Sequence, residues 1–138
     1  MTSNIIYLEE RGNIIYGSNP TMWTGKVGLM YASDFGYAVG GSMRETCLEK
    51  SLDKYGYADY CRNNNWLRID NNTQWTLSIG RTSICAITID DSGNSHCPYT
   101  YHGSNYYHIR STIYLNSNTI ISSGTGLSTD PIILKAIG

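Results

Sequence analysis

The feature that most constrains this fold is a set of four cysteines, Cys47, Cys61, Cys85 and Cys97. An even number of cysteines in a chain rich in Tyr, Asn and Ser indicates disulfide bonds, which persist in oxidising compartments. Of the pairings open to these cysteines, we favour the sequential one, Cys47–Cys61 with Cys85–Cys97, in which each bridge closes a local loop. The cysteines therefore predict an extracellular or cell-surface location.

Zinc binding and free thiols are the alternatives to disulfides. Zinc sites usually draw on cysteine pairs with about two to four residues between them, and none of these cysteines has a cysteine neighbour at that spacing. His96 beside Cys97 is a weak indication of a metal ligand. Buried free thiols are the other alternative. We expect disulfides, with neither a bound metal nor another cofactor.

Composition indicates one β-rich domain that spans residues 1–138. The chain has 12 Tyr and 14 Gly but a single Phe, and only 15% of its residues are charged. Tyr, Thr and Ile favour strands, and Asn, Gly and Ser favour turns, whereas a helical bundle would contain more Ala, Glu, Lys and Leu. Because 41% of the 138 residues are hydrophobic, the chain can bury a core, and we do not expect disorder.

Charge and hydropathy narrow the classes of partner. The net charge is −1, and the 10 Lys and Arg residues are scattered rather than gathered in the basic stripe typical of nucleic-acid binders. No apolar run approaches the roughly 20 residues that span a bilayer. The N-terminal sequence MTSNIIYLEERGN also lacks the pattern of a signal peptide. We expect no nucleic-acid partner, no direct membrane insertion of this segment, and any export signal or anchor upstream of Met1.

Polar turns divide the chain into short predicted elements. Ser33 and Asp34 suit a helix N-terminus, because their side-chain oxygens accept hydrogen bonds from free backbone N–H groups. Apolar runs between Gly, Asn, Asp and Ser clusters predict strands. Helices are expected at residues 35–38, 44–52 and about 57–62. Strands are expected at residues 4–8, 13–16, 23–32, 66–69, 74–78, 84–89, 97–101, 107–115, 119–121 and 132–134, with hairpins joining 4–8 to 13–16 and 84–89 to 97–101.

A series of landmarks along the chain resembles a known family. They are WTGKVGLMYASDFGYA at 23–38, WL at 66–67, WTLS at 75–78, IRSTIYL at 109–115 and SGTGLSTDPIIL at 123–134. This series resembles bacterial extracellular domains of C-type lectin-like type, often carried by pilin-associated or surface proteins of Gram-positive gut bacteria. The resemblance implies an α+β, C-type lectin-like fold, mostly antiparallel β with one or two short helices and paired N- and C-terminal strands.

Three segments carry that resemblance, and the sequence also departs from the family at several points. The segments 30–34, 75–78 and 110–112 stand where the lectin-like group has its helix start, its Trp-containing strand and its Arg-initiated strand. Ser111 replaces a Pro that is usual in the family. The chain also lacks the Glu-Pro-Asn, Gln-Pro-Asp and Trp-Asn-Asp triplets of calcium-dependent sugar sites in animal lectins, and a cysteine pair at formylglycine-enzyme spacing. The resemblance thus implies a scaffold without a defined chemistry.

The Tyr-rich segment 99–107 is the predicted ligand-binding region. Tyr combined with Ser, Gly and Asn is typical of adaptable binding loops, in which the rings supply contact area and the small residues supply hydrogen bonds. The alternative is a loop that packs on its own core. The residues that we expect to contact a glycan or protein ligand are Tyr99, Tyr101, His102, Asn105 and Tyr106.

Other candidate sites have simpler interpretations. Asp and Asn cluster at 70–72, at 90–94 and at Asp130, where they could bind calcium, but such residues also set turn geometry. His96, His102 and His108 have no Gly-x-Ser-x-Gly nucleophile elbow beside them. Three tryptophans are predicted to be buried anchors: Trp23, Trp66 and Trp75.

The sequence therefore predicts a non-catalytic extracellular binding or display domain, because it holds no catalytic constellation. Paired carboxylates at a recognisable spacing, a metal motif and a phosphate-binding loop are all missing from it. The alternative function is a structural subunit or decorating domain of a pilus or other surface filament. That alternative requires self-association, for example through an exposed strand edge.

Overall fold

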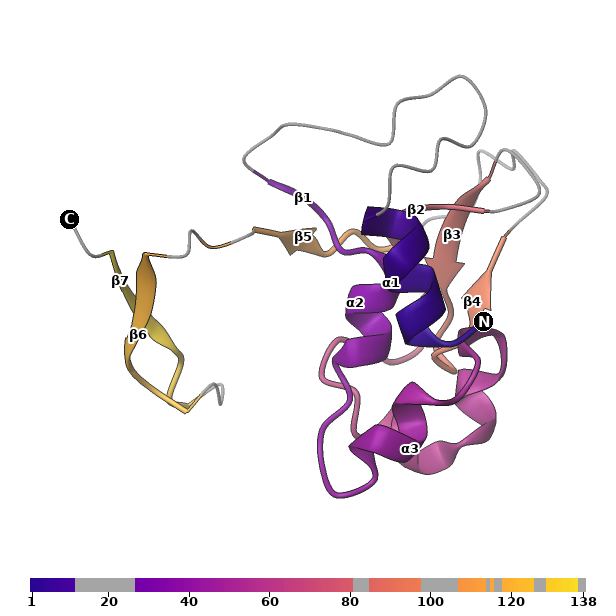
Figure 1. The fold of residues 1–138 in the computed structure, drawn as a ribbon, viewed down its shortest axis with the longest axis horizontal. Helices are drawn as coiled ribbons and strands as arrows, with labels where there is room; N and C mark the ends of the chain where they lie inside the picture. The colour runs from indigo at the N-terminus through magenta and orange to yellow at the C-terminus, as the bar shows by residue number, and fades with distance from the viewer. Residues whose placement is uncertain are drawn as a thin grey trace.

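A computed structural model describes residues 1–11, 27–80, 85–97, 107–113, 115, 118–125 and 129–136. It is an α+β structure in which short helices pack against small antiparallel sheets, as the predicted class requires (Figure 1). The helices are α1 (Ser3–Arg11), α2 (Ala32–Tyr37), α3 (Arg44–Leu48), the 3-10 helix η1 (Leu52–Tyr57) and α4 (Asp59–Asn63). The strands are β1 (Gly28–Leu29), β2 (Gln74–Ile79), β3 (Ala86–Ile89), β4 (Ser95–His96), β5 (Ser111–Thr112), β6 (Thr119–Ser123) and β7 (Ile133–Ala136).

The strands form antiparallel pairs that bring distant segments together. Strand β2 pairs with β3, and β3 pairs with β4, so a hairpin follows the predicted strand at 84–89; its return strand lies at 95–96 rather than at 97–101, of which residues 98–101 lie outside the described residues. Strand β1 pairs with β5, with Leu29 opposite Ser111. The backbone N–H of Leu77 donates to the carbonyl of Met30 at 2.8 Å, which links β2 to the end of β1. The β1–β5 ribbon is therefore tied to the central sheet.

The core lies where α2, η1 and β3 meet. Phe35, Leu52, Tyr55 and Ile89 are fully buried, and the rings of Phe35 and Tyr55 make an edge contact with centroids 5.8 Å apart. Gly93 comes close to both rings, since a Cβ at this position would lie 3.3 Å from Tyr55. The predicted helix at 35–38 is confirmed in kind, but it begins earlier, at Ala32.

Both predicted disulfides are confirmed. Cys47 is bonded to Cys61, with Cα atoms 5.6 Å apart, and Cys85 is bonded to Cys97, with Cα atoms 5.8 Å apart. The first bridge joins α3 to α4 and is buried in the core. In the described part of the chain, no helix has the length and apolarity needed to cross a membrane.

The predicted N-terminal strand is wrong, because residues 3–11 form helix α1. Ser3 and Ile6 are buried at helical spacing against the body of the protein, while Leu8 is 68% exposed. Close approach of α1 to α2 depends on Gly36, since a Cβ there would lie 2.7 Å from Ser3 Cβ. The predicted pairing of N- and C-terminal strands is also wrong for the described residues: β7 pairs with β6, and the N-terminus is helical.

Three smaller corrections concern residues 44–69. The helix predicted at 44–52 ends at Leu48, and η1 follows. The described helices are therefore more numerous than the one or two that the family resemblance implied. The strand predicted at 66–69 is wrong, because residues 66–67 form a turn and 68–69 have no regular structure; Trp66 is 71% exposed rather than a buried anchor. Its exposure follows from the burial of both neighbours, Asn65 and Leu67, which turn their side chains inward.

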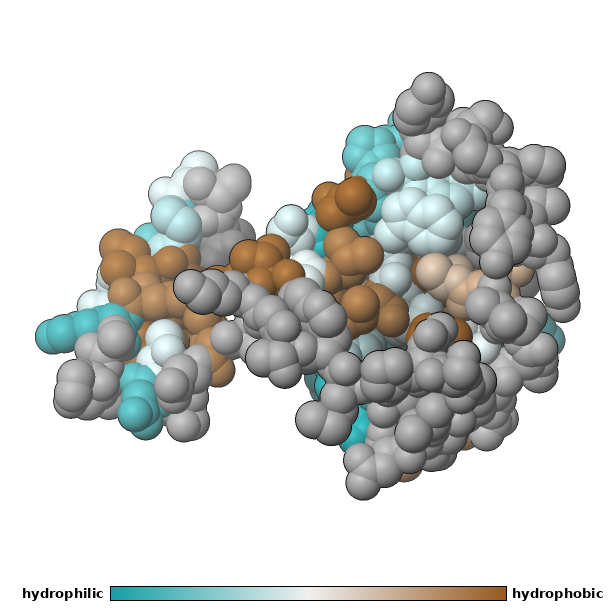
Figure 2. All heavy atoms as spheres, turned by 90° about the horizontal axis from the view of Figure 1, so that it is seen from above, coloured by the Kyte–Doolittle hydropathy of each residue, from teal (hydrophilic) through white to brown (hydrophobic). Residues whose placement is uncertain are grey.

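The β6–β7 hairpin matches the predicted strands at 119–121 and 132–134, and it projects from the rest of the described chain (Figure 1). Its large apolar side chains are exposed, and Figure 2 shows them as brown surface on the smaller lobe. They are Ile120, Ile121, Ile132, Ile133 and Leu134.

Candidate ligand pocket

The predicted ligand-binding residues Tyr99, Tyr101, His102, Asn105 and Tyr106 lie outside the described residues. Within the described chain, a different feature has the form of a ligand site. It is an open cavity of about 460 Å³ between α2, the turn at 66–67 and β5. This volume falls within the roughly 300–1,000 Å³ of small-molecule pockets. Its lining residues are Met30, Asp34, Tyr37, Ala38, Trp66, Leu67, Arg110, Ser111, Thr112 and Ile113.

The turn that carries Trp66 is held by buried polar side chains. The Asn65 Nδ2 group donates to the carbonyl of Phe35 at 2.7 Å, and its Oδ1 accepts from the N–H of Leu67 at 2.9 Å. Gln74 Nε2 donates to the Leu67 carbonyl at 3.0 Å. The N–H of Trp66 donates to the Ala38 carbonyl. The exposed indole therefore stands on a backbone fixed to both α2 and β2.

Arg110 is the cationic residue of the pocket lining. No hydrogen bond or ion pair joins its side chain to any residue that the structure describes, and its Nε is buried without an acceptor. Thr112 Oγ1, two residues along, is also buried without a partner among the described residues. Buried polar atoms usually find partners within the protein. Both residues belong to the lining of the cavity, so a ligand bound there would lie beside their polar side chains.

Asp34 lines the same pocket but is already engaged. Its Oδ1 accepts from Arg11 Nη2 at 3.1 Å, and its Oδ2 accepts from the backbone N–H of Tyr31 at 2.8 Å. The second bond caps the start of α2, as the sequence predicted for this carboxylate. The Arg11 guanidinium also lies over the Tyr31 ring, 3.7 Å from its centroid. Asp34 is therefore already paired with a cation of its own.

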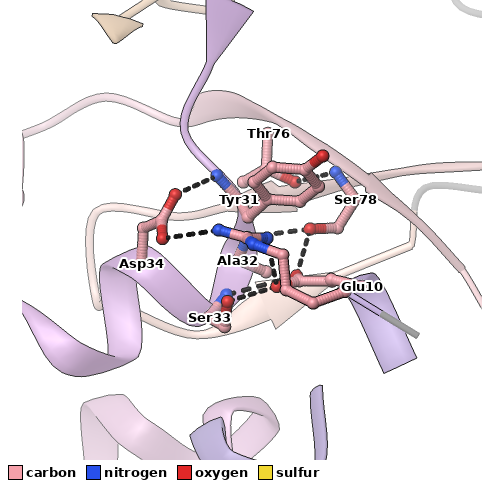
Figure 3. Close-up of polar contacts among 8 residues, drawn as sticks. Glu10, Tyr31, Ala32, Ser33, Asp34, Thr76 and Ser78 are labelled. Carbon is pink, nitrogen blue, oxygen red and sulfur yellow. Dashed lines mark hydrogen bonds and ion pairs between the residues drawn. The ribbon is translucent and has the colours of Figure 1, made fainter. Parts of the chain in front are cut away.

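Next to Asp34, a polar cluster formed by Glu10, Ser33 and Ser78 fixes the first turn of α2 (Figure 3). Glu10 accepts hydrogen bonds from the backbone N–H of Ser33 at 3.2 Å and from the hydroxyls of Ser33 and Ser78. The Ser78 hydroxyl oxygen accepts in turn from the N–H of Ala32 at 2.8 Å. Side chains from α1 and β2 thus satisfy N–H groups that a helix start leaves free.

The Glu10 carboxyl is almost completely enclosed, with a side-chain exposure of 6%. Burial raises the pKa of Glu10 above its ordinary value, and the hydrogen bonds from Ser33 and Ser78 together with nearby Arg11 offset part of the rise. In the sequence, Glu10 falls in the turn expected between residues 4–8 and 13–16. The spacing of Ser3, Ile6 and Glu10 on one helical face is the signal that could have revealed its burial.

Replacing Glu10 with Gln should change how stability depends on pH. The folded protein binds the Glu10 proton more tightly than the unfolded chain, so the free energy of unfolding falls as pH rises from the ordinary carboxyl pKa through the raised one. Glu10→Gln has no carboxyl to titrate at this position, so its free energy of unfolding should rise relative to that of the wild type across that pH window. The rise should be about 1.4 kcal/mol for each tenfold difference in proton affinity between the folded and unfolded states. Urea unfolding from about pH 4 to about pH 8 measures this difference.

The control for this prediction is Glu45→Gln, which removes a carboxylate that is 84% exposed. Its unfolding profile should run parallel to that of the wild type. If the pH profile of Glu10→Gln were also parallel to that of the wild type, this result would contradict a raised pKa for Glu10.

The other predicted candidates form turns and surface pairs. Asn71 has a φ of 58°, and Asn72 Nδ2 donates to the Asp70 carbonyl at 3.0 Å. Asp90 accepts from the N–H of Asn94 at 2.8 Å, and Asp130 accepts from the N–H of Thr125 at 2.9 Å. These bonds are the turn geometry expected for Asp and Asn.

The described histidines and Trp75 do not line the pocket. His96 Nε2 lies 2.7 Å from Asp90 Oδ2, and the ring of half-buried Trp75 makes an edge contact with Tyr107. His108 is an exposed residue beside β2, while Trp23 and His102 lie outside the described residues. Among the residues described, no group of three or more His, Cys, Asp or Glu is placed to hold a metal ion.

Comparison of the chain with protein-family models, with curated proteins and with solved structures gives no match. The pocket and its supporting contacts are therefore the basis for a functional proposal.

Proposed function

We propose that this chain is a non-catalytic binding domain of an extracellular or cell-surface protein, built on a C-type lectin-like scaffold. Two disulfides support an oxidising location. The adjacency of the three segments of the resemblance supports the scaffold. Ala32, at the helix start, donates to Ser78 in the Trp-containing strand, and β1, which leads into α2, pairs with the Arg-initiated strand β5.

The observation that carries the binding function is the pocket at Trp66. A tryptophan that is 71% exposed, on a backbone held by buried hydrogen bonds, leaves a rigid ring free for contact with a ligand. Aromatic rings supply large contact areas at low entropic cost. Apolar walls with a few convergent polar groups are typical of ligand sites. The domain therefore has a preformed surface for a glycan or protein ligand, in addition to the Tyr-rich segment proposed from the sequence.

Glycan and protein arrays probed with the whole chain test this function. Trp66→Ala should weaken binding to any ligand found by about tenfold or more, because it removes the exposed aromatic contact of the pocket. Leu8→Ala is the matched control, since Leu8 is 68% exposed on α1 and does not line the pocket. Tyr101→Ala and Tyr106→Ala test the Tyr-rich segment in parallel. Arrays that yield no ligand for the folded protein would count against a binding domain.

A second candidate function is a subunit or decorating domain of a pilus or other surface filament. The observation that favours it is the β6–β7 hairpin, whose isoleucine and leucine side chains are exposed. Exposed apolar patches and open strand edges are typical of surfaces that associate. Electron microscopy of the full-length protein separates the two functions: filaments favour the second, and dispersed monomers favour the first.

A further inference from the structure

We infer that the pocket recognises a carboxylate-bearing sugar, with Arg110 binding the carboxylate and Trp66 packing on the sugar ring. This inference rests on the proposed binding function and adds to it the chemical class of the ligand. Three observations support the inference: the distribution of charge in the pocket, the exposed Trp66 ring, and the lack of hydrogen-bond partners for Arg110 and Thr112 among the described residues.

Charge in the pocket favours an anion at Arg110. The charged residues of the lining are Asp34 and Arg110. Asp34 is paired with Arg11 at 3.1 Å, so its charge is already balanced by a residue of α1. Arg110 has no ion pair with any described residue, and its side chain is half-buried. Charge complementarity therefore calls for a negatively charged group on the ligand.

The geometry of a guanidinium selects among anions. Its planar fork of N–H donors matches the two oxygens of a carboxylate, and such paired bonds are shorter and stronger than neutral ones. The side chains of Arg110 and Thr112 both line the pocket, and neither has a hydrogen bond to a residue that the structure describes. A carboxylate beside hydroxyl groups, as on an acidic sugar, offers acceptors and donors for both side chains.

The rest of the pocket suits a ring rather than an extended chain. Trp66 stands at the rim with most of its surface exposed, and Tyr37 adds a second aromatic lining residue from α2. Met30, which is apolar and completely buried, also belongs to the lining. The faces of sugar rings carry C–H groups that pack on aromatic rings, while their edges carry hydroxyls. This division matches an aromatic rim and a polar wall supplied by Arg110 and Ser111.

An NMR titration of the whole chain tests the ligand class, with D-glucuronate, its neutral methyl ester and D-glucose as probes. Glucuronate should bind at least about tenfold more tightly than the ester or glucose, since a hydrogen-bonded charge pair contributes that much or more. Backbone signals of α2 and β5 should shift on binding. Added salt should weaken binding of glucuronate and leave the neutral sugars unchanged.

Variants then assign the contacts. Arg110→Gln should weaken binding of glucuronate by about 10- to 100-fold and leave the weak binding of glucose unchanged. Arg110→Lys keeps the positive charge but loses the planar pair of guanidinium N–H donors. Its affinity for glucuronate should therefore lie between those of Arg110→Gln and the wild type. Trp66→Ala should weaken both sugars, and Trp66→Phe should restore part of the binding. Arg44→Gln is the control, because Arg44 is an exposed cation outside the pocket. Thermal unfolding confirms that each variant is folded.

The outcomes separate this inference from the proposed function. Equal affinity for glucuronate and its ester, or full affinity in Arg110→Gln, would overturn the acidic-sugar assignment while leaving a binding domain in place. A short peptide with a free C-terminal carboxylate is included as a probe. If it binds in an Arg110-dependent way and glucuronate does not, the inference is wrong about the ligand class. If the arrays and every probe give no binding, both proposals fail.

Discussion

Phe35→Ala should lower the free energy of unfolding by about 3–5 kcal/mol, the range found when a buried aromatic side chain is truncated. Phe35 is completely buried, and its ring contacts Tyr55 at a centroid distance of 5.8 Å. Truncation leaves a cavity bounded by Tyr55 and Gly93, whose backbone is fixed by the β3–β4 turn. Since domains are stable by about 5–15 kcal/mol, this loss is a large fraction of the whole stability. Urea unfolding monitored by circular dichroism measures it.

Two further variants test whether the loss of stability comes from the buried volume of the Phe35 ring. Phe35→Leu keeps much of the buried volume and should cost clearly less than Phe35→Ala. Ile121→Ala removes an apolar side chain that is 65% exposed on the β6–β7 hairpin, and it should change stability by no more than about 0.5 kcal/mol. A Phe35→Ala variant as stable as the wild type would mean that α2 does not pack on η1.

Structure could be predicted best from the sequence where the local chemistry of the residues and the tertiary packing favour the same structure. Asp34 has the side chain that a helix start needs, and it caps α2 in the structure. Cys85 and Cys97 flank a turn rich in Asp, Ser and Gly, and the hairpin brings them together. In both cases the interaction spans only a few residues or one turn, so the sequence contains the whole signal.

Helix α1 shows why other elements could not be predicted. Its apolar residues Ile5, Tyr7 and Leu8 are exposed, whereas the polar residues Ser3 and Glu10 face the protein beside Ile6. An apolar pattern normally marks the buried face, so here it gives the wrong secondary structure. What stabilises α1 is contact with Gly36 and the hydrogen bonds from Ser33 and Ser78, which come from segments far along the chain.

The candidate pocket was unpredictable for a related reason. A tryptophan in a mostly apolar segment is usually buried, and the segment around Trp66 resembles a strand. Its exposure depends on Asn65, which turns inward to bind the Phe35 carbonyl, a contact across 30 positions. Arg110 looks ordinary in the sequence. Its lack of partners among the described residues is visible only once β5 is placed beside α2.

Replacing Cys47 and Cys61 together with Ala should lower the free energy of unfolding by about 3 kcal/mol or more. The bridge closes a loop with a sequence separation of 14, and a loop of about 15 residues restricts the unfolded chain by about 3 kcal/mol. Both cysteines are almost completely buried, so the double variant also leaves a small cavity between α3 and α4. Denaturant unfolding of the double variant, and of the wild type with and without reductant, measures the loss.

The second bridge provides the comparison that separates these two contributions. Cys85–Cys97 has a sequence separation of 12, close to the 14 of Cys47–Cys61, so the loop-closure effect is nearly the same for both. Cys85 and Cys97 are only half-buried, and their removal leaves less empty volume. The Cys47/Cys61 variant should therefore lose more stability than the Cys85/Cys97 variant, and the difference measures the packing around the buried bridge. Equal losses would show that loop closure alone accounts for both, and a loss under about 1 kcal/mol for Cys47/Cys61 would contradict a bridge in the folded core.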